Sequence, residues 1–572
     1  MSLSYGACDC PLCVPSTSEA PTVPTSSGES NAQPQPQPQP EPEPEPAPEL
    51  EPEPVVVTPL PKLQLSVVAC NHIAETVAST VIHPFVNDLV RNIGVANGHE
   101  RKTGYYVGAV ESVFYAAQGL TFIHWNRAAE SVGRKPMMLG GTLGIAVSMM
   151  GFGLSNSFAG VLLSRCAQGA FNGNIGVTSS VMTEITDPTN AAQAFSFIPI
   201  ARSIGATLGP LIGGILVNPA KQWPDIFGSI KLLKEYPYLL PCLIATAIPL
   251  AVLVFGSVGL KETLPSLIER KRQLEALIHS KQGAKLGLQT PDSPLLPSIP
   301  SPSQAYGAIT DYVNHKVPTT LAKKTRPDPK VAISQLVATA TSINYHELLL
   351  PRVFLSLFNY ALLAFLDQSV LVLIPLIYST PVHLGGLSLT PAKIGSILGF
   401  WGSANGFLQA YCFAWFHRHL GQRSCYMLGL VGLFACFALF PIISKFVEWD
   451  GGKIGCWVWL GVSLQLVAYM LSHMSYACIS MYIAVCAPSE ESAKSINSLS
   501  QMGVSGARSL APSISSPLFA FSLELYHDRG YDLGEYFVHA VLCTLSLMAL
   551  GSSFYLPKTL EDEKGKKIQD TE

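Results

Sequence analysis

The sequence predicts an all-α polytopic membrane protein with 12 transmembrane helices in two six-helix pseudo-repeats. Three observations predict this fold class: the composition, a succession of long apolar runs, and a repeat between the two halves. Of the 572 residues, 48% are hydrophobic and only 13% are charged, whereas a soluble domain carries about 25% charged residues. The net charge of −3 and the lack of a basic stripe do not favour a nucleic-acid partner.

Apolar runs of about 20 residues, each long enough to cross the ~30 Å hydrocarbon core, follow one another along the chain. We expect the first six helices near 65–90, 104–125, 137–156, 159–183, 194–217 and 238–259. The second six are expected near 353–378, 393–416, 425–444, 456–486, 496–521 and 536–556. These runs define an N-terminal half, 63–260, and a C-terminal half, 351–556.

Polar segments flank and separate the two halves. Residues 1–62 hold a PQPQPQ–EPEPEP tract, which cannot bury enough apolar surface to fold, so we expect a disordered tail. We expect a cytoplasmic linker at 261–350 and a charged cytoplasmic tail at 557–572. Cys8, Cys10 and Cys13 lack a fourth ligand for a metal site, which leaves lipidation or an incidental cluster open.

Lys and Arg residues predict the orientation of the helices, because they concentrate in cytoplasmic loops. Basic residues follow helices 2 and 8 and recur in the linker and the C-terminal tail, among them Arg134, Lys135, Arg418, Arg423 and Lys558. Fewer lie in the loops of the opposite side. We therefore expect both termini in the cytoplasm, and the plasma membrane rather than the vacuolar membrane.

The segment 201–216, ARSIGATLGPLIGGIL, is built for close helix packing. Small residues recur every fourth position and so share one helical face: Ala201, Gly205, Gly209 and Gly213. Such a face lets another helix approach closely in lipid, and Pro210 favours a kink. Arg202 brings a charge that costs about 2.5–3.5 kcal/mol on insertion scales, so it requires a partner or a wet cavity.

The two halves repeat around this segment. ARSIGATLGPL at 201–211 aligns with ARSLAPSISSP at 507–517, which places Arg508 where the first half has Arg202. ESVGRKPMMLG at 130–140 aligns with RHLGQRSCYMLG at 418–429. Two parallel halves around a central site are typical of transporters with internal repeats.

These motifs resemble the major facilitator superfamily over residues 65–556. The loop after helix 2 matches the family's first signature at Gly133, Arg134 and Lys135, while Asn126, Glu130 and Ser131 depart from it. The resemblance implies that Glu130 locks the cytoplasmic gate. Two further segments match family signatures: Arg165 with Gln168 and Gly169 in helix 4, and Gly205 to Gly214 with Gly209, Pro210 and Gly213 in helix 5.

The helix 5 match is to the signature of drug/proton antiporters, and longer stretches resemble fungal multidrug and metabolite facilitators, including those of the psilocybin pathway. They are distantly similar to plant zinc-induced facilitators. The resemblance implies a monomeric, proton-driven exporter of a small organic molecule, with a tryptamine-type alkaloid as a candidate and no cofactor or metal. Import of a nutrient or metal chelate, and a non-transporting sensor, stay open. No nucleophile–base set recurs with usable spacing, so we expect no enzyme.

Three intramembrane acids are candidate proton or substrate sites, because such charges usually mark a pathway. Glu75 either carries the proton or forms a fixed ion pair with His72 or Arg202. Glu111 either contacts substrate or hydrogen-bonds a nearby Ser or Tyr. Asp367 and its neighbour Gln368 match a family position, and the resemblance implies that they face the cavity from the second half.

The intramembrane cations are candidates for gating or for tuning these acids. The family resemblance implies that Arg165 assists proton transfer; alternatively it hydrogen-bonds the backbone of helix 1. Arg202 and Arg508 occupy symmetric positions, which suits gate or cavity ion pairs as well as a structural role. His83 and His473 are interpreted as core histidines with satisfied hydrogen bonds.

Overall fold

The computed structural model describes residues 58–187, 189–273, 351–486, 490–527 and 536–557. The 8–13 cysteine cluster and most of the expected tail and linker lie outside the described residues. The described residues form helices and no strand, in the order that the sequence predicts. Six of these helices are long and apolar enough to cross a membrane, and the all-α fold class is confirmed.

The N-terminal half contains α1 (Lys62–Thr80), α2 (Val86–Ile93), α3 (Thr103–Val132), α4 (Arg134–Gly153), α5 (Phe158–Asn172), α6 (Ile175–Glu184), α7 (Ala191–Phe195), α8 (Phe197–Ile215) and α12 (Leu239–Gly259). Short helices α9 (Pro219–Gln222), α10 (Pro224–Phe227) and α11 (Lys231–Glu235) lie in one loop. The expected helix 65–90 is interrupted at 81–85, where Pro84 lacks a backbone donor. The expected helix 159–183 divides between α5 and α6, where the side chain of Asn174 donates to the Met138 carbonyl.

The C-terminal half contains α18 (Pro351–Ser379), α19 (Pro391–Phe407), a π turn η3 (Leu408–Cys412), α20 (Phe413–Leu420), α21 (Gln422–Trp449), α22 (Cys456–Ser472), α23 (Met474–Cys486), α24 (Glu490–His527) and α25 (Phe537–Ser553). We call the end of the bundle that carries Gly133, Leu260 and Pro351 the linker end, and the opposite end the far end.

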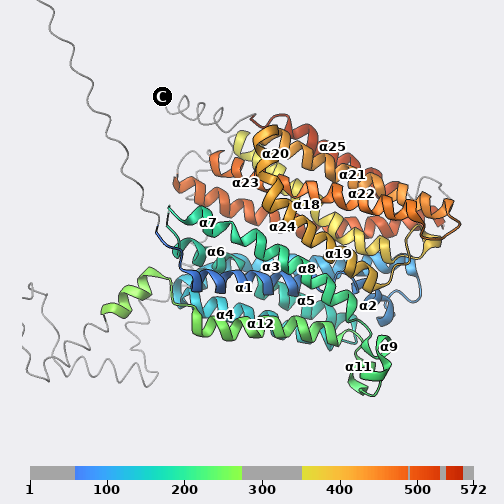
Figure 1. Cartoon of the computed structure of the whole chain (residues 1–572), viewed down its shortest axis with the longest axis horizontal. Helices are drawn as coiled ribbons and strands as arrows, with labels where there is room; N and C mark the ends of the chain where they lie inside the picture. The colour runs from blue at the N-terminus through green and yellow to red at the C-terminus, as the bar shows by residue number, and fades with distance from the viewer. Residues whose placement is uncertain (1–57, 188, 274–350, 487–489, 528–535, 558–572) are drawn as a thin grey trace, which may run out of the picture. The chain divides into compact units, whose positions relative to one another are not determined.

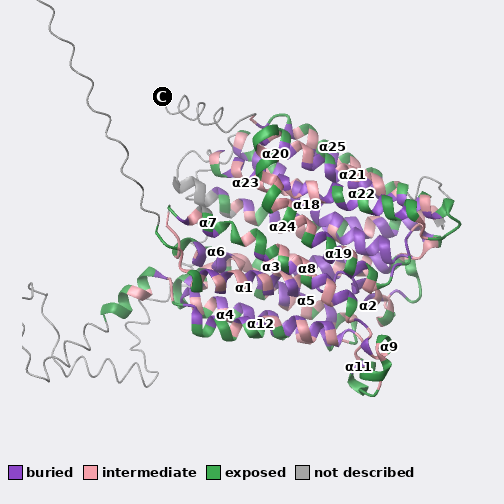
Figure 2. Ribbon diagram, in the orientation of Figure 1, coloured by how far each residue is buried: buried purple, intermediate pink, exposed green. Residues whose placement is uncertain are grey.

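The N-terminal and C-terminal halves lie side by side, and each has its own buried core (Figure 1, Figure 2). They meet where α8 contacts α19 and where α3 contacts α24. Hydrogen bonds join the halves at the far end and near the middle of these helices: Arg91 Nη2 to Ser379 O, Ser203 Oγ to Gly402 O, and Ser513 Oγ to Ser112 Oγ.

The small face of α8 packs directly on the backbone of α1. A Cβ atom added at Gly213 would lie 1.8 Å from the Val81 carbonyl oxygen, and one at Gly209 would lie 2.1 Å from Thr80 Oγ1. Gly205 makes a similar approach to Thr76. Glycine is therefore required at these positions for the two helices to approach this closely.

A second small face of α8 packs on α19. A Cβ atom at Gly214 would lie 2.5 Å from the Pro391 carbonyl oxygen, and one at Gly395 would lie 2.3 Å from the Pro210 carbonyl oxygen. Glycines continue along this face of α19 at positions 395, 399, 402 and 406. The sequence interpretation identified only the first of the two faces, although the α19 glycines recur at helical spacing.

The repeat between the halves extends to backbone conformation. Gly133, between α3 and α4, has φ +114°, and Gly421, between α20 and α21, has φ +76°. Both values lie in a region that favours glycine. The aligned segments therefore make the same turn at the linker end of each half.

Candidate functional site

A buried ion pair lies at the centre of the N-terminal half. Arg165 Nη2 on α5 is 3.1 Å from Glu111 Oε2 on α3, and the two side chains are only 1% and 2% exposed. His83 Nε2 lies 3.8 Å from the other oxygen of Glu111. Glu111 is thus paired with Arg165, whereas the sequence interpretation considered Arg202 and Arg508 as its cationic partners.

Gln168 connects this pair to α1. Arg165 Nη1 donates to Gln168 Oε1 at 2.7 Å, and Gln168 Nε2 donates to the Ala78 carbonyl at 2.9 Å. The Arg165 guanidinium also lies over the Phe114 ring, 4.4 Å from its centroid. Gln168 therefore makes the hydrogen bond to the α1 backbone, while Arg165 forms the ion pair with Glu111.

Glu75 on α1 belongs to a separate polar network. Its Oε1 accepts a hydrogen bond from Asn71 Nδ2 at 2.7 Å, and its Oε2 lies 3.4 Å from His72 Nδ1. Asn71 also bonds Thr178 and Thr142, which links α1 to α6 and α4. Glu75 is buried and held by neighbours on its own helix, among them the His72 partner that one sequence interpretation named.

Among the described residues of the C-terminal half, Asp367 on α18 is the buried acid. Tyr476 Oη donates to Asp367 Oδ2 at 2.8 Å, and His473 Nε2 lies 3.9 Å from Asp367 Oδ1. Oδ1 and the neighbouring Gln368 Nε2 are buried with no hydrogen-bond partner. His473, which the sequence interpretation placed among satisfied core histidines, lies beside this carboxylate.

Aromatic rings enclose this acid. Trp401 on α19 stacks on Tyr469 at 4.6 Å and 8°, and His473 packs edge-on against both rings at 5.2 and 5.0 Å. Tyr360 meets Tyr476 edge-on at 6.1 Å. These aromatic residues come from α18, α19, α22 and α23, so they lie together only in the folded protein.

Polar groups continue from one half to the other. Tyr115 on α3 interacts electrostatically with Glu111, Arg165 and Arg508, and its hydroxyl interacts with the side chain of Gln368. The Arg508 guanidinium on α24 lies 5.8 Å from the centroid of the Tyr476 ring. Tyr115 and Arg508 thus connect the buried pair of the N-terminal half to the acid of the C-terminal half.

Arg202 on α8 joins the same set of groups. It interacts electrostatically with Glu75, Tyr360, Tyr476 and Arg508. The two symmetric arginines therefore lie near one another, and Arg202 keeps an exposed side chain. An exposed cation within this polar set is consistent with contact with water.

A second group of charges lies at the linker end. Arg134 Nε is 3.0 Å from Glu184 Oε1, and Glu262 accepts hydrogen bonds from the backbone N–H groups of Arg134 and Lys135 at 2.7 and 3.1 Å. Glu130 is exposed to solvent. The acids that hold the signature loop are Glu184 and Glu262, so the gate role expected of Glu130 stays a prediction that this geometry does not support.

The connection between α6 and α7 is organised by Asp187. Its carboxylate accepts hydrogen bonds from Thr189 N at 2.9 Å and from the hydroxyls of Thr189 and Thr58. These hydrogen bonds, first that from Thr189 and then that from Thr58, lower the pKa of Asp187 below its usual value. The start of the described chain is thereby attached to this loop.

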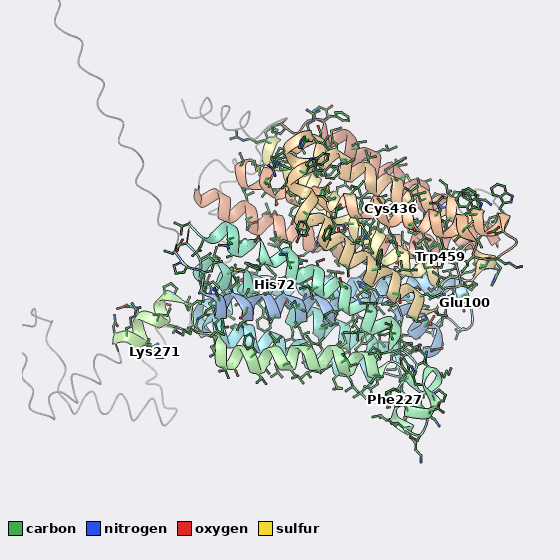
Figure 3. All side chains as sticks on the ribbon, in the orientation of Figure 1. His72, Glu100, Phe227, Lys271, Cys436 and Trp459 are labelled. Carbon is green, nitrogen blue, oxygen red and sulfur yellow. The ribbon has the colours of Figure 1, made fainter. Side chains whose placement is uncertain are left out.

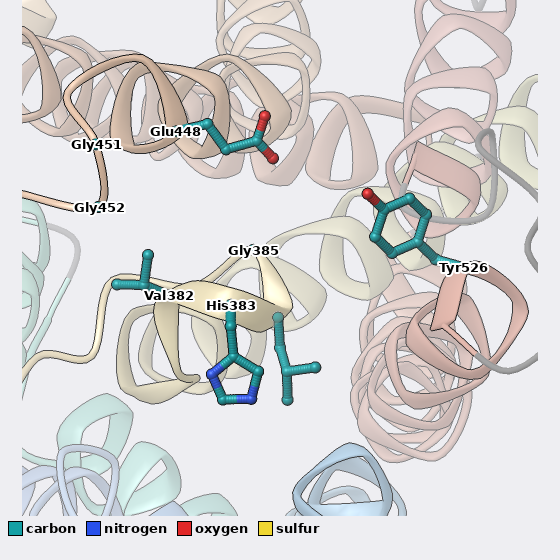
Figure 4. A pocket seen from close by; sticks show the side chains of 8 residues that line it. Val382, His383, Gly385, Glu448, Gly451, Gly452 and Tyr526 are labelled. Atoms are coloured by element: carbon teal, nitrogen blue, oxygen red, sulfur yellow. The ribbon is translucent and has the colours of Figure 1, made fainter.

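Two cavities open at the far end, apart from the groups described above. One of about 410 Å³ is lined by the following residues (Figure 4): Val382, His383, Leu384, Gly385, Glu448, Gly451, Gly452 and Tyr526. Another, of about 680 Å³, is lined in part by residues of α9 and α11, which lie in the same loop as Phe227, labelled in Figure 3. Within the described part of the chain, no three His, Cys, Asp or Glu side chains gather as a metal site requires.

The helical bundle and its charged interior define the class of protein: a polytopic membrane transporter built of two halves. The family model of the Major Facilitator Superfamily matches residues 65–512. The chain therefore belongs to the Major Facilitator Superfamily, as the signature motifs predicted, and it is a secondary transporter, not an enzyme.

Similar proteins include fungal transporters. The chain is 28% identical over 509 residues to the major facilitator-type transporter psiT2 of Psilocybe cyanescens, covering 88% of this chain and 91% of that protein. It is 25% identical over 501 residues to the efflux pump azaK of Aspergillus niger, covering 87% and 89%. The plant protein ZINC INDUCED FACILITATOR 1 of Arabidopsis thaliana is 34% identical over 194 residues, 34% of this chain and 40% of that protein.

Among solved structures, the human organic anion transporter MFSD10 has a TM-score of 0.51 and 16% identity, covering 87% of this chain and all of that one. At this identity the likeness shows the fold alone.

Proposed function

We propose that the protein is a proton-coupled exporter of small organic molecules in the plasma membrane, acting as a monomer with both termini in the cytoplasm. The observation that carries this proposal is the set of polar groups that runs from Glu111 and Arg165 through Tyr115 and Arg508 to Asp367. Intramembrane charges are costly, and they typically mark a substrate or ion pathway.

Glu75 and Asp367 are the acids best suited to exchange a proton or meet a substrate. Among the described residues, neither forms an ion pair with Lys or Arg within 4.0 Å, and each keeps one carboxylate oxygen without a hydrogen-bond partner. Glu111 differs, because Arg165 neutralises it in a site that solvent barely reaches. The proton gradient supplies the energy, and no cofactor takes part.

Export rests on the antiporter signature of α8 and on the relative that is an efflux pump. Hydrogen bonds such as Arg91 to Ser379 and Ser203 to Gly402 join the halves at the far end and the middle. With the linker end in the cytoplasm, this arrangement suits loading of substrate from inside the cell. The fungal relatives support a secondary metabolite as substrate, with a tryptamine-type alkaloid as a candidate.

Two measurements test this function. Untargeted metabolomics of cells with and without the protein identifies the molecule that accumulates when the protein is absent. Flux of that molecule is then measured in inverted membrane vesicles with and without an imposed proton gradient. Uptake that drives proton efflux supports antiport; uptake without proton efflux refutes it and favours an importer or uniporter, and absence of any flux in liposomes favours a sensor.

A substitution tests the role of the first acid. Glu75→Gln keeps the side-chain volume and can still accept the hydrogen bond from Asn71, so we expect the variant to fold. We expect proton-coupled flux to be abolished, because the amide cannot carry a proton between the two sides. Unchanged antiport in Glu75→Gln vesicles would exclude this residue as the proton carrier.

A further inference from the structure

Thr58 fastens the segment before α1 to the loop between α6 and α7. Its hydroxyl donates a hydrogen bond to Asp187 Oδ2, and its backbone N–H donates to Thr189 Oγ1 at 3.2 Å. In return, Asn190 Nδ2 donates to the Thr58 hydroxyl oxygen at 3.1 Å and to the Thr58 carbonyl at 3.3 Å. Figure 1 shows the start of the described chain beside α6 and α7 at the linker end. We call these hydrogen bonds among Thr58, Asp187, Thr189 and Asn190 the Thr58 latch.

The Asp187 carboxylate is the anion on which the Thr58 latch depends. It accepts hydrogen bonds from the Thr58 hydroxyl and from both the N–H and the hydroxyl of Thr189. These hydrogen bonds, that from Thr189 first, lower the pKa of Asp187, so the carboxylate is charged at neutral pH. A second anion on the Thr58 oxygen would remove one donor and add repulsion between like charges.

Thr58 also has the sequence and the conformation of a substrate for a proline-directed kinase. Pro59 follows it, both residues are exposed, and residues 58–61 lie outside any helix. The proline keeps Thr58 extended, and exposed segments near the ends of a domain are the ones that modifying enzymes reach most easily. The linker, which joins the bundle at the same end, carries three more such dipeptides, at Thr290, Ser293 and Ser301.

The start of α1 offers a phosphate a favourable position once the Thr58 latch is open. α1 begins at Lys62, and its N-cap, Pro61, makes no side-chain hydrogen bond to the helix. The first turn of this described helix holds no acidic residue. Free N–H groups at a helix N-terminus, together with a nearby lysine, stabilise a phosphate. Repulsion by Asp187 and attraction by α1 therefore act in the same direction.

We propose that Thr58 is a phosphorylation site for a proline-directed protein kinase, and that the phosphate opens the Thr58 latch. The hydroxyl oxygen attacks the γ-phosphorus of ATP, the bond from this phosphorus to the β–γ bridging oxygen breaks, and ADP leaves. The hydroxyl proton passes to the catalytic base of the kinase. The phosphate ester, with a charge of about −1.5 to −2 at pH 7, has no proton to donate to Asp187. The segment before α1 then detaches from the loop between α6 and α7.

The first measurement tests the modification itself. The purified full-length protein in detergent is incubated with a mitogen-activated protein kinase, magnesium and ATP, and phosphate is located by mass spectrometry of proteolytic peptides. We expect phosphate on Thr58, its loss in Thr58→Ala, and its retention in Thr58→Ser, which keeps the acceptor hydroxyl. Thr390 is the matched control, because it is also exposed and followed by proline but is fixed as the N-cap of α19; it should be labelled far more slowly.

The second measurement tests the opening of the Thr58 latch. Hydrogen exchange of the 189–190 amides is compared at pH 7 before and after phosphorylation. The background is Thr290→Ala, Ser293→Ala and Ser301→Ala, so that linker phosphates do not contribute. We expect phosphorylation to accelerate exchange at least about tenfold, since it removes a hydrogen bond to a charged group and adds repulsion. Thr58→Ala without phosphate should accelerate exchange less, and Asp187→Asn should reduce the effect of the phosphate because the repulsion needs the Asp187 charge.

Three results would overturn the proposal. The first is absence of phosphate on Thr58 while the same kinase labels a standard peptide substrate. The second is a phosphorylated Thr58 with unchanged exchange of the 189–190 amides. The third is an acceleration by phosphate no larger than that of Thr58→Ala, which would exclude repulsion as its cause. Neither measurement involves transport, so failure of proton-coupled flux would refute the proposed function and leave this site unaffected.

Discussion

Removing Arg165 alone should be more damaging than removing both members of the Glu111–Arg165 pair. The side chains are 1% and 2% exposed and their charges are 3.1 Å apart. Among the described residues, Arg165→Leu leaves the buried carboxylate with His83, at 3.8 Å, as its one remaining basic neighbour within 4.0 Å. Breaking a buried pair in this way costs about 3–5 kcal/mol of unfolding free energy. Replacing both partners by neutral groups, as in Glu111→Gln with Arg165→Leu, should recover most of that loss.

The assay is thermal unfolding of the purified protein in detergent at one scan rate, since large membrane proteins often unfold irreversibly. We expect the order of Tm to be unaltered protein, then the double variant, then Arg165→Leu.

An exposed ion pair provides the control. Lys445 and Glu448 are 2.9 Å apart but 48% and 51% exposed, so Lys445→Leu should cost less than about 1 kcal/mol. A double variant as unstable as Arg165→Leu would refute the reasoning, since the loss would then come from packing and not from an unpaired charge.

Three further predictions concern packing and the linker end. Gly213→Ala should destabilise the fold by about 1–3 kcal/mol or more, because its Cβ would lie 1.8 Å from the Val81 carbonyl oxygen. The control is Gly503→Ala, whose Cβ would meet no atom within 4 Å and which should be neutral or stabilising in the same thermal melt. Equal effects of the two substitutions would contradict the packing described. Glu184→Gln should lower the unfolding free energy by about 1 kcal/mol through loss of the Arg134 pair, and Tm should fall with it. Glu130→Gln should leave Tm unchanged; the reverse order would restore Glu130 as the locking acid. Hydrogen bonds lower the pKa of Asp187 in the folded protein, so the stabilisation of its loop is present above the unfolded pKa of about 3.9 and is lost as the pH falls through the lower folded pKa. Hydrogen exchange of the 189–190 amides should become faster as the pH falls through that lower value. Asp187→Asn should show no such increase.

Local chemistry was sufficient to predict most helices. Apolar runs predicted helices that match α4, α12, α18 and α25 to within a few residues at each end. The sequence did not predict the break at 81–85 or the π turn within the expected helix 393–416. Both are short irregularities of the helical backbone inside apolar runs, and mean hydropathy does not detect them.

Partners across helices were harder to predict. Glu111 was selected because charges in apolar runs are expensive, and Arg165 and Asp367 because they match family positions. Pairing Glu111 with Arg165 requires knowing that α3 and α5 lie side by side. The contact of His473 with Asp367 spans α18 and the junction of α22 with α23, more than 100 residues apart. A lone histidine in an apolar run carries no signal of such a partner.

The two glycine-lined faces of α8 have a mechanical consequence. At Gly213 against Val81 and at Gly214 against Gly395, backbone meets backbone with no side chain between them. Interlocked side chains resist sliding because each must leave its hole before it can enter the next. A contact made mainly of backbone presents lower barriers of this kind. We therefore expect α19 to tilt against α8 without repacking the interior of either half.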